Sequence, residues 1–223
     1  NIDSGATIAN SGTATGFGGL ASGDVIPADD GSVGAPGLSF ADDADNGLYR
    51  IGANNFGVAV AGAKAMEFHA IGAVTAPLQP AFNATSTANQ ASATGDGTTV
   101  TVVFGSERYD INSDFDGVST FTAPVTGKYL FHFSVRTDDT VSGTNDEGAT
   151  AIVTSNLGYN QVFNYGVLTE GNSGAERIYW RMSVQCDMDA ADTATCTIII
   201  KGGTKIVDVR NDNATTFSGM LVV

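Results

Sequence analysis

His69 and His132 are the two histidines of the chain, and histidine is the side chain best suited to acid–base catalysis near neutral pH. A histidine-based site also needs a nucleophile or a substrate group within hydrogen-bond reach. The sequence near either histidine contains no nucleophile motif, zinc-ligand spacing or phosphate-binding loop. We therefore predict structural or surface roles for both, no catalytic residue and no organic cofactor. A glycan-cleaving enzyme stays as an alternative, because paired carboxylates in a cleft would suffice for that reaction.

The segment from Asn112 to Gly117 places oxygen-bearing side chains at alternate positions, Asn112, Asp114 and Asp116. Alternate oxygens before a glycine are typical of calcium loops, in which several ligands converge on one hard cation. Such a loop ends on a bidentate glutamate at its twelfth position, where this chain has Ala123. Two interpretations stay open: the three side chains bind calcium, or the segment is a solvated turn.

Cys186 and Cys196 are the two cysteines. Cys186 ends a run of alternating apolar residues, Cys196 begins another, and the acidic segment 187–195 lies between them. If this segment turns a hairpin, both sulfur atoms face one side of neighbouring strands. A disulfide and a pair of buried free thiols are then equally compatible with the sequence.

Acidic residues outnumber basic ones by 24 to 10, which gives a formal net charge of −14. This charge argues against a nucleic-acid partner, which needs clustered Lys and Arg, and against docking on anionic lipid. No apolar run reaches the roughly 18 residues that a membrane span requires, so we expect no membrane insertion. Glycine accounts for 28 of 223 residues, which favours short strands joined by tight turns.

The first two segments of the chain differ in pattern from the rest. Residues 1–35 are rich in glycine and lack periodicity, so we expect an irregular segment. Residues 36–78 contain four short strand-like runs, at 37–40, 47–51, 56–60 and 65–68. A hairpin of such short strands is marginal in water. We therefore expect residues 36–78 to be stabilised by association.

Residues 79–223 contain longer runs that alternate between apolar and polar residues. Tyr129, Phe131 and Phe133 share one face of the run 128–135, and the run 177–186 alternates in the same way. Period-two alternation of this length is typical of half-buried strands. Further strands are predicted at 98–104, 119–123, 150–155, 161–168, 195–201, 205–209 and 215–223. Many strands without a helix predict an all-β fold, an antiparallel jelly-roll sandwich.

Within 79–223, a pattern of aromatic residues and glycines resembles the complement globular-head family, whose jelly roll is shared with tumour-necrosis-factor-like proteins. The opening strand of that family corresponds to Pro80-Ala81-Phe82-Asn83-Ala84. The signature of the family is met by Phe104, Asp110, Phe115, Phe121, Gly127, Tyr129, Phe131, Phe133, Phe217 and Gly219. The interval from Phe115 to Phe121 is one residue shorter than in the family pattern. The resemblance implies a homotrimer in which these residues serve folding and assembly, and some relatives bind calcium near the trimer axis.

Residues 35–74 resemble a repeat of bacteriophage tail-fibre and virion-fibre proteins. The likeness rests on Ala35-Pro36-Gly37-Leu38-Ser39-Phe40, on Asp45-Asn46-Gly47-Leu48-Tyr49-Arg50 and on the glycines between Gly52 and Gly62. It implies a thin shaft in which three chains share one β-structure, so that neighbouring chains complete strands too short to stand alone.

Together these resemblances predict a non-enzymatic bacteriophage fibre protein with a short-stranded trimeric β-shaft (36–78) and a jelly-roll tip (79–223). As a tail-fibre tip it would attach the particle to the host, with receptor contacts in the loops 137–149 and 168–175. The expected partners are two further copies of the chain, other virion proteins at the N-terminal end, and a host-surface glycan or protein. The protein would be assembled in the host cytoplasm and located on the virion surface. The alternatives are a capsid (head) fibre or decoration protein and a secreted, calcium-dependent complement-like lectin.

Overall fold

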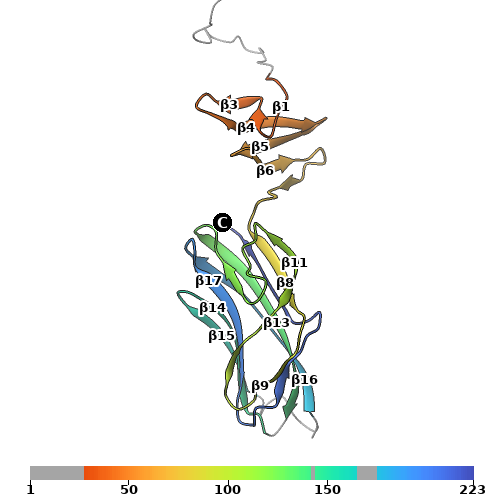
Figure 1. Cartoon of the computed structure of the whole chain (residues 1–223), viewed down its shortest axis with the longest axis vertical. Coiled ribbons are helices and arrows are strands. Elements are labelled where there is room, and N and C mark those ends of the chain that lie inside the picture. Colours follow the sequence, from red (N-terminus) through yellow and green to blue (C-terminus); the bar gives the residue numbers. More distant parts are fainter. Residues whose placement is uncertain (1–27, 142–143, 165–174) are drawn as a thin grey trace, which may run out of the picture. The chain divides into compact units, whose positions relative to one another are not determined.

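The computed structural model describes residues 28–141, 144–164 and 175–223. These residues form strands and their connections without an α-helix, so the predicted all-β class is confirmed. In the described ranges no helix is long and apolar enough to cross a membrane. The chain divides between Val74 and Thr75 into two compact units, called unit 1 and unit 2 below (Figure 1).

Unit 1 contains a five-stranded antiparallel sheet in the order β3-β4-β5-β6-β7. The four predicted strands overlap the first four of these, whose bounds are β3 (Leu38–Phe40), β4 (Asp43–Gly52), β5 (Asn55–Val60), β6 (Ala63–Phe68) and β7 (Val74–Thr75). The segment 1–35 was expected to be irregular, but its end contains β1 (Gly31–Ser32), which pairs with β2 (Ala35–Pro36). Residues 1–27 lie outside the described ranges.

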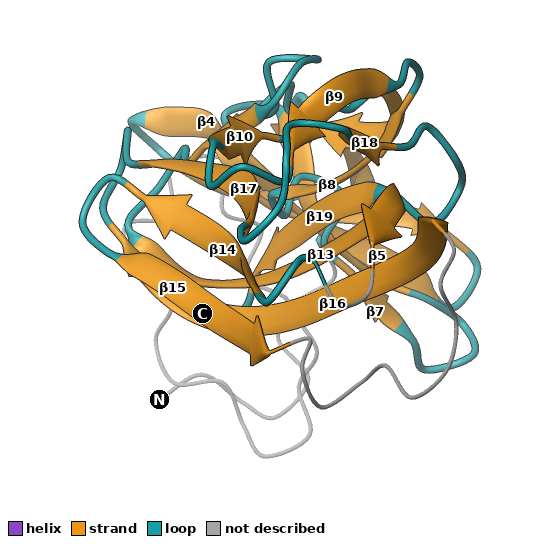
Figure 2. Cartoon of the chain, turned by 90° about the horizontal axis from the view of Figure 1, so that it is seen from below, coloured by secondary structure: helices purple, strands orange, loops and turns teal. Residues whose placement is uncertain are grey.

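Unit 2 is a sandwich of two antiparallel sheets, as predicted (Figure 2). The first, called the β13 sheet, has the order β11-β8-β19-β13-β18-β9, and β16 also pairs with β13. Its strands are β8 (Ala81–Ser86), β9 (Gln90–Thr94), β11 (Gly105–Ile111), β13 (Gly127–Val141), β16 (Ala175–Met188), β18 (Val207–Val209) and β19 (Thr216–Leu221). The second, called the β17 sheet, has the order β10-β17-β14-β15, and β12 also pairs with β17. Its strands are β10 (Thr99–Thr101), β12 (Thr120–Thr122), β14 (Glu147–Thr154), β15 (Gly158–Asn164) and β17 (Thr193–Ile200).

Two strands of unit 2, β9 and β11, have no counterpart among the predicted runs. Residues Gln90–Thr94 carry no large apolar side chain, and most of Gly105–Ile111 is polar, so neither segment shows the alternation used for prediction. Both strands are held by their neighbours, β18 and β8, rather than by an apolar face of their own. Of the predicted strand 161–168, residues 165–168 lie outside the described ranges.

The core of unit 2 consists of aromatic rings packed between the two sheets. Phe82 on β8 stacks on Phe115 and Phe121, with ring centroids 5.1 and 5.0 Å apart. It meets the edge of Phe217 on β19 at 4.9 Å. All of these rings are buried, as is the predicted inward face of β13 with Tyr129, Phe131, Phe133 and Val135. Aromatic burial with stacked and edge-on geometry is a main source of stability in such cores.

Gly219 allows β19 to approach this core closely. A Cβ atom at Gly219 would lie 2.4 Å from Cδ1 of Phe131 and 2.8 Å from Cε1 of Phe82. Gly127 has a similar role at the start of β13, where a Cβ atom would lie 2.6 Å from Cδ1 of Leu221 and from the carbonyl oxygen of Val223. Both signature glycines are therefore required by space rather than by a turn.

We expect Gly219→Ala to lower the free energy of unfolding by about 1–3 kcal/mol, because the added methyl group must displace two packed rings. The measurement is urea unfolding of the full chain, followed by the fluorescence of Trp180. Gly158→Ala is the matched control, since the nearest atom to its Cβ position is Nδ2 of Asn160 at 3.7 Å. An equal loss of stability in both variants would contradict the packing argument.

Candidate functional site

The signature residues of the complement-head resemblance meet in the core of unit 2. The aromatic members are all buried: Phe104, Phe115, Phe121, Tyr129, Phe131, Phe133 and Phe217. The single hydroxyl among them, on Tyr129, donates a hydrogen bond to the carbonyl oxygen of Val125 at 2.7 Å. The signature therefore specifies packing and presents no reactive group.

Asp110, the charged member of the signature, holds the turn that follows β11. Its carboxylate accepts hydrogen bonds from the backbone N–H groups of Asp114 and Phe115, at 3.2 and 3.0 Å. Oδ1 of Asp116 accepts three more, from the N–H groups of residues 118, 119 and 120, at 2.7 to 2.9 Å. Phe115 and Phe121 then pair across the turn. The interval that is one residue shorter than in the family pattern therefore forms a closed, hydrogen-bonded turn.

Two of the three candidate calcium ligands, Asn112 and Asp116, make hydrogen bonds in or beside this turn. Nδ2 of Asn112 donates to the carbonyl oxygen of Leu78 at 2.9 Å, and Oδ1 of Asp116 is occupied by N–H groups. Burial, and then the neighbouring Asp110, raise the pKa of Asp114, which favours its protonated form. Within the described ranges no three His, Cys, Asp or Glu side chains gather to hold a metal ion. Asn112 and Asp116 are thus engaged in hydrogen bonds, whereas Oδ2 of Asp114 is buried without a hydrogen-bond partner in the described ranges, and calcium binding stays a prediction.

Cys186 and Cys196 are buried free thiols on different sheets. Cys186 lies on β16 opposite Tyr129 of β13, whereas Cys196 lies on β17 opposite Ile152 of β14. The expected hairpin between neighbouring strands is wrong, because β16 and β17 pair with different partners. Burial raises the pKa of both thiols, which keeps them protonated and unreactive near neutral pH.

The two histidines lie in different units. His132 is exposed on the outer face of β13, opposite the aromatic face, as predicted. Ser218 and Ser183 are its neighbours across the strands, but among the described contacts no hydrogen bond joins it to either serine. His69 has its Nδ1 atom 3.5 Å from Oε1 of Glu67. Neither arrangement is that of a nucleophile activated by a base.

Most of the expected receptor loop 137–149 belongs to the scaffold. Residues up to Val141 continue β13, and Glu147 begins β14. Thr137 is buried and accepts a hydrogen bond from Nε1 of Trp180 at 3.2 Å. Asn145 is also buried and donates to the carbonyl oxygens of residues 95 and 201. The expectation of a free loop is therefore wrong for most of this range, and residues 142–143 and 165–174 lie outside the described ranges.

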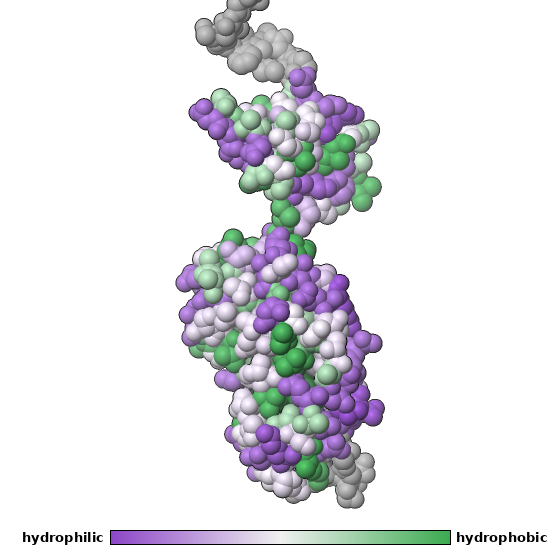
Figure 3. Space-filling view, viewed as in Figure 1, coloured by the Kyte–Doolittle hydropathy of each residue, from purple (hydrophilic) through white to green (hydrophobic). Residues whose placement is uncertain are grey.

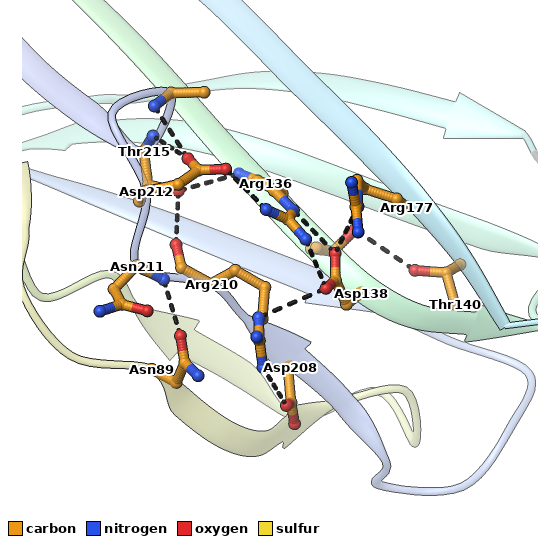
Figure 4. A network of polar contacts seen from close by, with 12 residues as sticks. Asn89, Arg136, Asp138, Thr140, Arg177, Asp208, Arg210, Asn211, Asp212 and Thr215 are labelled. Atoms are coloured by element: carbon orange, nitrogen blue, oxygen red, sulfur yellow. Dashed lines mark hydrogen bonds and ion pairs between the residues drawn. The ribbon is translucent and has the colours of Figure 1, made fainter.

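An ion-pair network that the sequence pattern does not reveal joins β13, β16 and the segment after β18 (Figure 4). Oδ2 of Asp138 lies 2.7 Å from Nη2 of Arg136 and 3.3 Å from Nε of Arg210. Oδ1 of Asp138 lies 3.7 Å from Nε of Arg177, and Nη1 of Arg136 lies 2.9 Å from Oδ2 of Asp212. The side chain of Arg136 is 14% exposed, so water screens these pairs less than it screens open surface pairs. The local signal was weak, because Arg177, Arg210 and Asp212 reach the site only through strand pairing.

The network shifts the pKa values of Arg136 and Asp212. Hydrogen bonds to Asp138, and then to Asp212, raise the pKa of the Arg136 guanidinium. Burial raises the pKa of Asp212, but the hydrogen bonds from Arg136 and from the N–H of Ala214 outweigh it and hold that pKa below its ordinary value. A carboxyl group with a lowered pKa in the folded state stabilises the fold at neutral pH, and this stabilisation is lost as the pH falls through that pKa.

The outer face of the β13 sheet carries three cross-strand rows without a carboxylate. The rows are Ala81, Met220, Leu130 and Gln185; Asn83, Ser218, His132 and Ser183; and Thr85, Thr216, Ser134 and Arg181. Oδ1 of Asn83 and Oγ of Ser134 are buried on this face and have no hydrogen-bond partner within the described chain. The outer face of the β17 sheet, around Thr195 and Thr197, also lacks carboxylates. The two unpartnered atoms, Oδ1 of Asn83 and Oγ of Ser134, therefore distinguish the outer face of the β13 sheet from the outer face of the β17 sheet.

We expect Arg136→Gln to lower the free energy of unfolding at neutral pH by about 1–3 kcal/mol, because Asp138 and Asp212 lose a charged donor. Lys201→Gln is the control, since its pair with Glu147 is open to water and should contribute less than about 1 kcal/mol. The wild type should lose stability as the pH falls below the ordinary aspartate range, and Arg136→Gln should lose less. Urea unfolding across this pH range measures both effects, and identical pH profiles would contradict the assignment.

No protein-family model matches the chain, and neither does any curated protein. The globular domain of zebrafish complement 1qA protein is similar in structure at 18% identity, over 65% of this chain and 98% of that one, with a TM-score of 0.43. Two crystal structures of murine APRIL, at pH 8.5 and pH 8.0, are similar at 8% identity over 65% of this chain and 99% of theirs. Their TM-scores are 0.44 and 0.45.

Proposed function

We propose that the chain is the distal part of a bacteriophage fibre, a non-enzymatic homotrimer that binds the host cell surface through unit 2. The observation that carries this proposal is that the aromatic residues of the complement-head signature lie together in one hydrophobic core. The motif therefore describes the packing of this chain and is more than a coincidence of spacing. The same motif, by resemblance, implies assembly into a homotrimer.

The outer face of the β13 sheet is the surface that we assign to trimer contact. Its three central rows hold no carboxylate. Copies of a chain with a net charge of −14 repel one another, and a contact face without carboxylates adds less to that repulsion. Buried polar atoms cost free energy unless they are hydrogen-bonded. A neighbouring copy would supply the partners that Oδ1 of Asn83 and Oγ of Ser134 lack.

Trimer formation supports attachment through avidity. Three identical binding surfaces on one particle raise the effective concentration of the second and third contacts, so each single contact to a glycan or protein can be weak. The described contacts within unit 2 are those of a scaffold, with buried thiols and a hydrogen-bonded turn at the acidic segment 112–117. These features favour binding over catalysis.

The virion assignment rests on the resemblance of residues 35–74 to fibre repeats. The short strands and small buried core of unit 1 are compatible with that resemblance. We place the chain at a tail-fibre tip, with a capsid fibre as the alternative, since both would join other virion proteins at the N-terminal end. The high negative charge would keep assembled fibres apart in the host cytoplasm and on the particle.

We expect the wild-type chain to sediment as a trimer and Ser218→Asp to dissociate it, because three carboxylates would enter the contact face. Thr197→Asp is the matched control, since Thr197 is equally half-buried on the outer face of the other sheet. Sedimentation equilibrium at micromolar concentration gives the masses. A monomeric wild type contradicts the trimer, and dissociation by Thr197→Asp alone would move the contact to the β17 sheet.

The virion role is tested by labelling phage particles with antibodies against unit 2 and viewing them by electron microscopy. We expect label at the tip of the tail. Label on the capsid would favour the head fibre, and particles without label would contradict a virion protein. Binding to host cells that disappears on calcium removal would favour the lectin alternative.

A further inference from the structure

We infer that Asn55, Lys64 and Glu67 form a site of self-modification, in which an amide bond comes to join Nζ of Lys64 to Cγ of Asn55 within one chain. The three side chains belong to the β5–β6 hairpin of unit 1 (Figure 1). Asn55 begins β5, and the other two lie on β6. Such a bond forms within a single copy of the chain, so it does not depend on the proposed function.

A bulge in the hairpin brings Lys64 and Glu67 to the same side of the sheet. Residues three apart on a regular strand point to opposite sides. Glu67 pairs with Gly57 across the hairpin. Two residues further along β5, Ala59 pairs with Lys64, because β6 contains one extra residue there. Asn55 lies two residues before Gly57 and therefore projects from that side as well. The register of one hairpin thus collects an amine, a carboxylate and an amide.

The carboxylate of Glu67 contacts both nitrogen atoms that would take part in the reaction. Nδ2 of Asn55 donates a hydrogen bond to Oε1 of Glu67 at 2.8 Å. Nζ of Lys64 donates to the other oxygen, Oε2. The attacking nitrogen and the leaving nitrogen of an amide exchange are therefore held on one carboxylate. A carboxylate in this position can pass a proton from one nitrogen to the other.

The chain itself limits the access of water to the site. The side chain of Glu67 is 10% exposed and that of Lys64 is 39% exposed. Oδ1 of Asn55 is buried and has no hydrogen-bond partner in the described chain. The ring of Tyr49 lies over Gly57, where a Cβ atom would be 2.8 Å from Cε1 of that ring. Limited access of water favours attack by the amine over hydrolysis of the same amide.

The resting state of the site is an ion pair. Hydrogen bonds from Lys64, and then from Asn55, lower the pKa of Glu67. The hydrogen bond to Glu67 raises the pKa of Lys64. Tyr49 also raises the pKa of Lys64, and His69 also lowers that of Glu67. Nζ must lose a proton before it can attack, so we expect the bond to form slowly after the chain has folded.

The reaction exchanges one amide for another and needs no co-reactant. Glu67 takes a proton from the ammonium group of Lys64, and the free amine attacks Cγ of Asn55. The bond from Cγ to Nζ forms, and the bond from Cγ to Nδ2 breaks once Nδ2 has received the proton from Glu67. The second proton of the amine passes through the carboxylate to the departing ammonia, which leaves as ammonium. Nothing is oxidised or reduced, and Glu67 ends as a carboxylate.

A covalent bond at this place would stabilise the unit with the smaller core. Within residues 28–74 the buried residues are Pro36, Gly57, Ala59 and Glu67, none of them a large aliphatic or aromatic residue. Figure 3 shows hydrophobic residues at the surface of unit 1. A bond between residues 55 and 64 closes the β5–β6 hairpin, which restricts the unfolded chain as a disulfide does.

Intact-mass measurement of the unfolded full chain tests for the bond. We expect the wild type to be lighter than its sequence by one ammonia molecule, in a fraction that grows while the folded chain is incubated at neutral pH. Trypsin should then fail to cut after Lys64 and should yield one internally joined peptide, 51–108. Lys64→Arg keeps a positive charge beside Glu67 but removes the amine, so it should show neither change. Lys201→Arg is the matched control, since Lys201 also pairs with a carboxylate, that of Glu147, and it should behave like the wild type.

The role of the carboxylate is tested by Glu67→Gln, which should slow bond formation by about 10²–10⁴-fold because the proton relay is lost. Amide hydrogen exchange of β5 and β6 shows that each variant is folded. A wild type that keeps its full sequence mass after prolonged incubation overturns the inference. Ammonia loss that persists in Lys64→Arg also overturns it, because an asparagine would then have cyclised onto the backbone. Covalently joined pairs of chains would place the bond between copies and overturn it as well.

Discussion

The packing of aromatic rings around Phe82 is the interaction on which the rest of unit 2 depends. Rings from β8, β13, β19 and the turn after β11 meet there, so the core closes the two sheets onto each other. The close approach of β19 requires a residue without Cβ at Gly219. The turn that delivers Phe115 and Phe121 is held by the carboxylates of Asp110 and Asp116. The acidic segment 112–117 thus helps to hold two rings of the core in place.

Unit 1 has alternating strands like those of unit 2, but it has no comparable aromatic core within the described chain. Its strands alternate correctly, yet its large apolar side chains gather on one face that nothing in the described chain covers. Burial of apolar surface is the main favourable term in folding, and in unit 1 much of this surface stays exposed within the described chain. Unit 2 closes its core within one chain, and unit 1 leaves one layer open.

Charged side chains are unevenly distributed over unit 2. The chain carries 24 acidic and 10 basic residues, but the central rows on the outer face of the β13 sheet hold no carboxylate. Three arginines and three aspartates are instead collected at one place in unit 2, where they tie strands together. The central rows of this face therefore carry no negative charge, and the ion-pair network lies on strands of the same sheet.

The sequence by itself determined which residues point inward. The alternation around Tyr129, Phe131 and Phe133 and the spacing of the signature residues predicted the all-β class and the aromatic core, because period-two alternation is a local property of a strand. Only the tertiary structure decided which strands are neighbours, since pairing is set by hydrogen bonds between segments far apart in the chain. For this reason Cys186 and Cys196 lie on opposite sheets, and Arg136 meets Asp212. The same long-range pairing makes β9 and β11 strands, although their own residues carry no strand pattern.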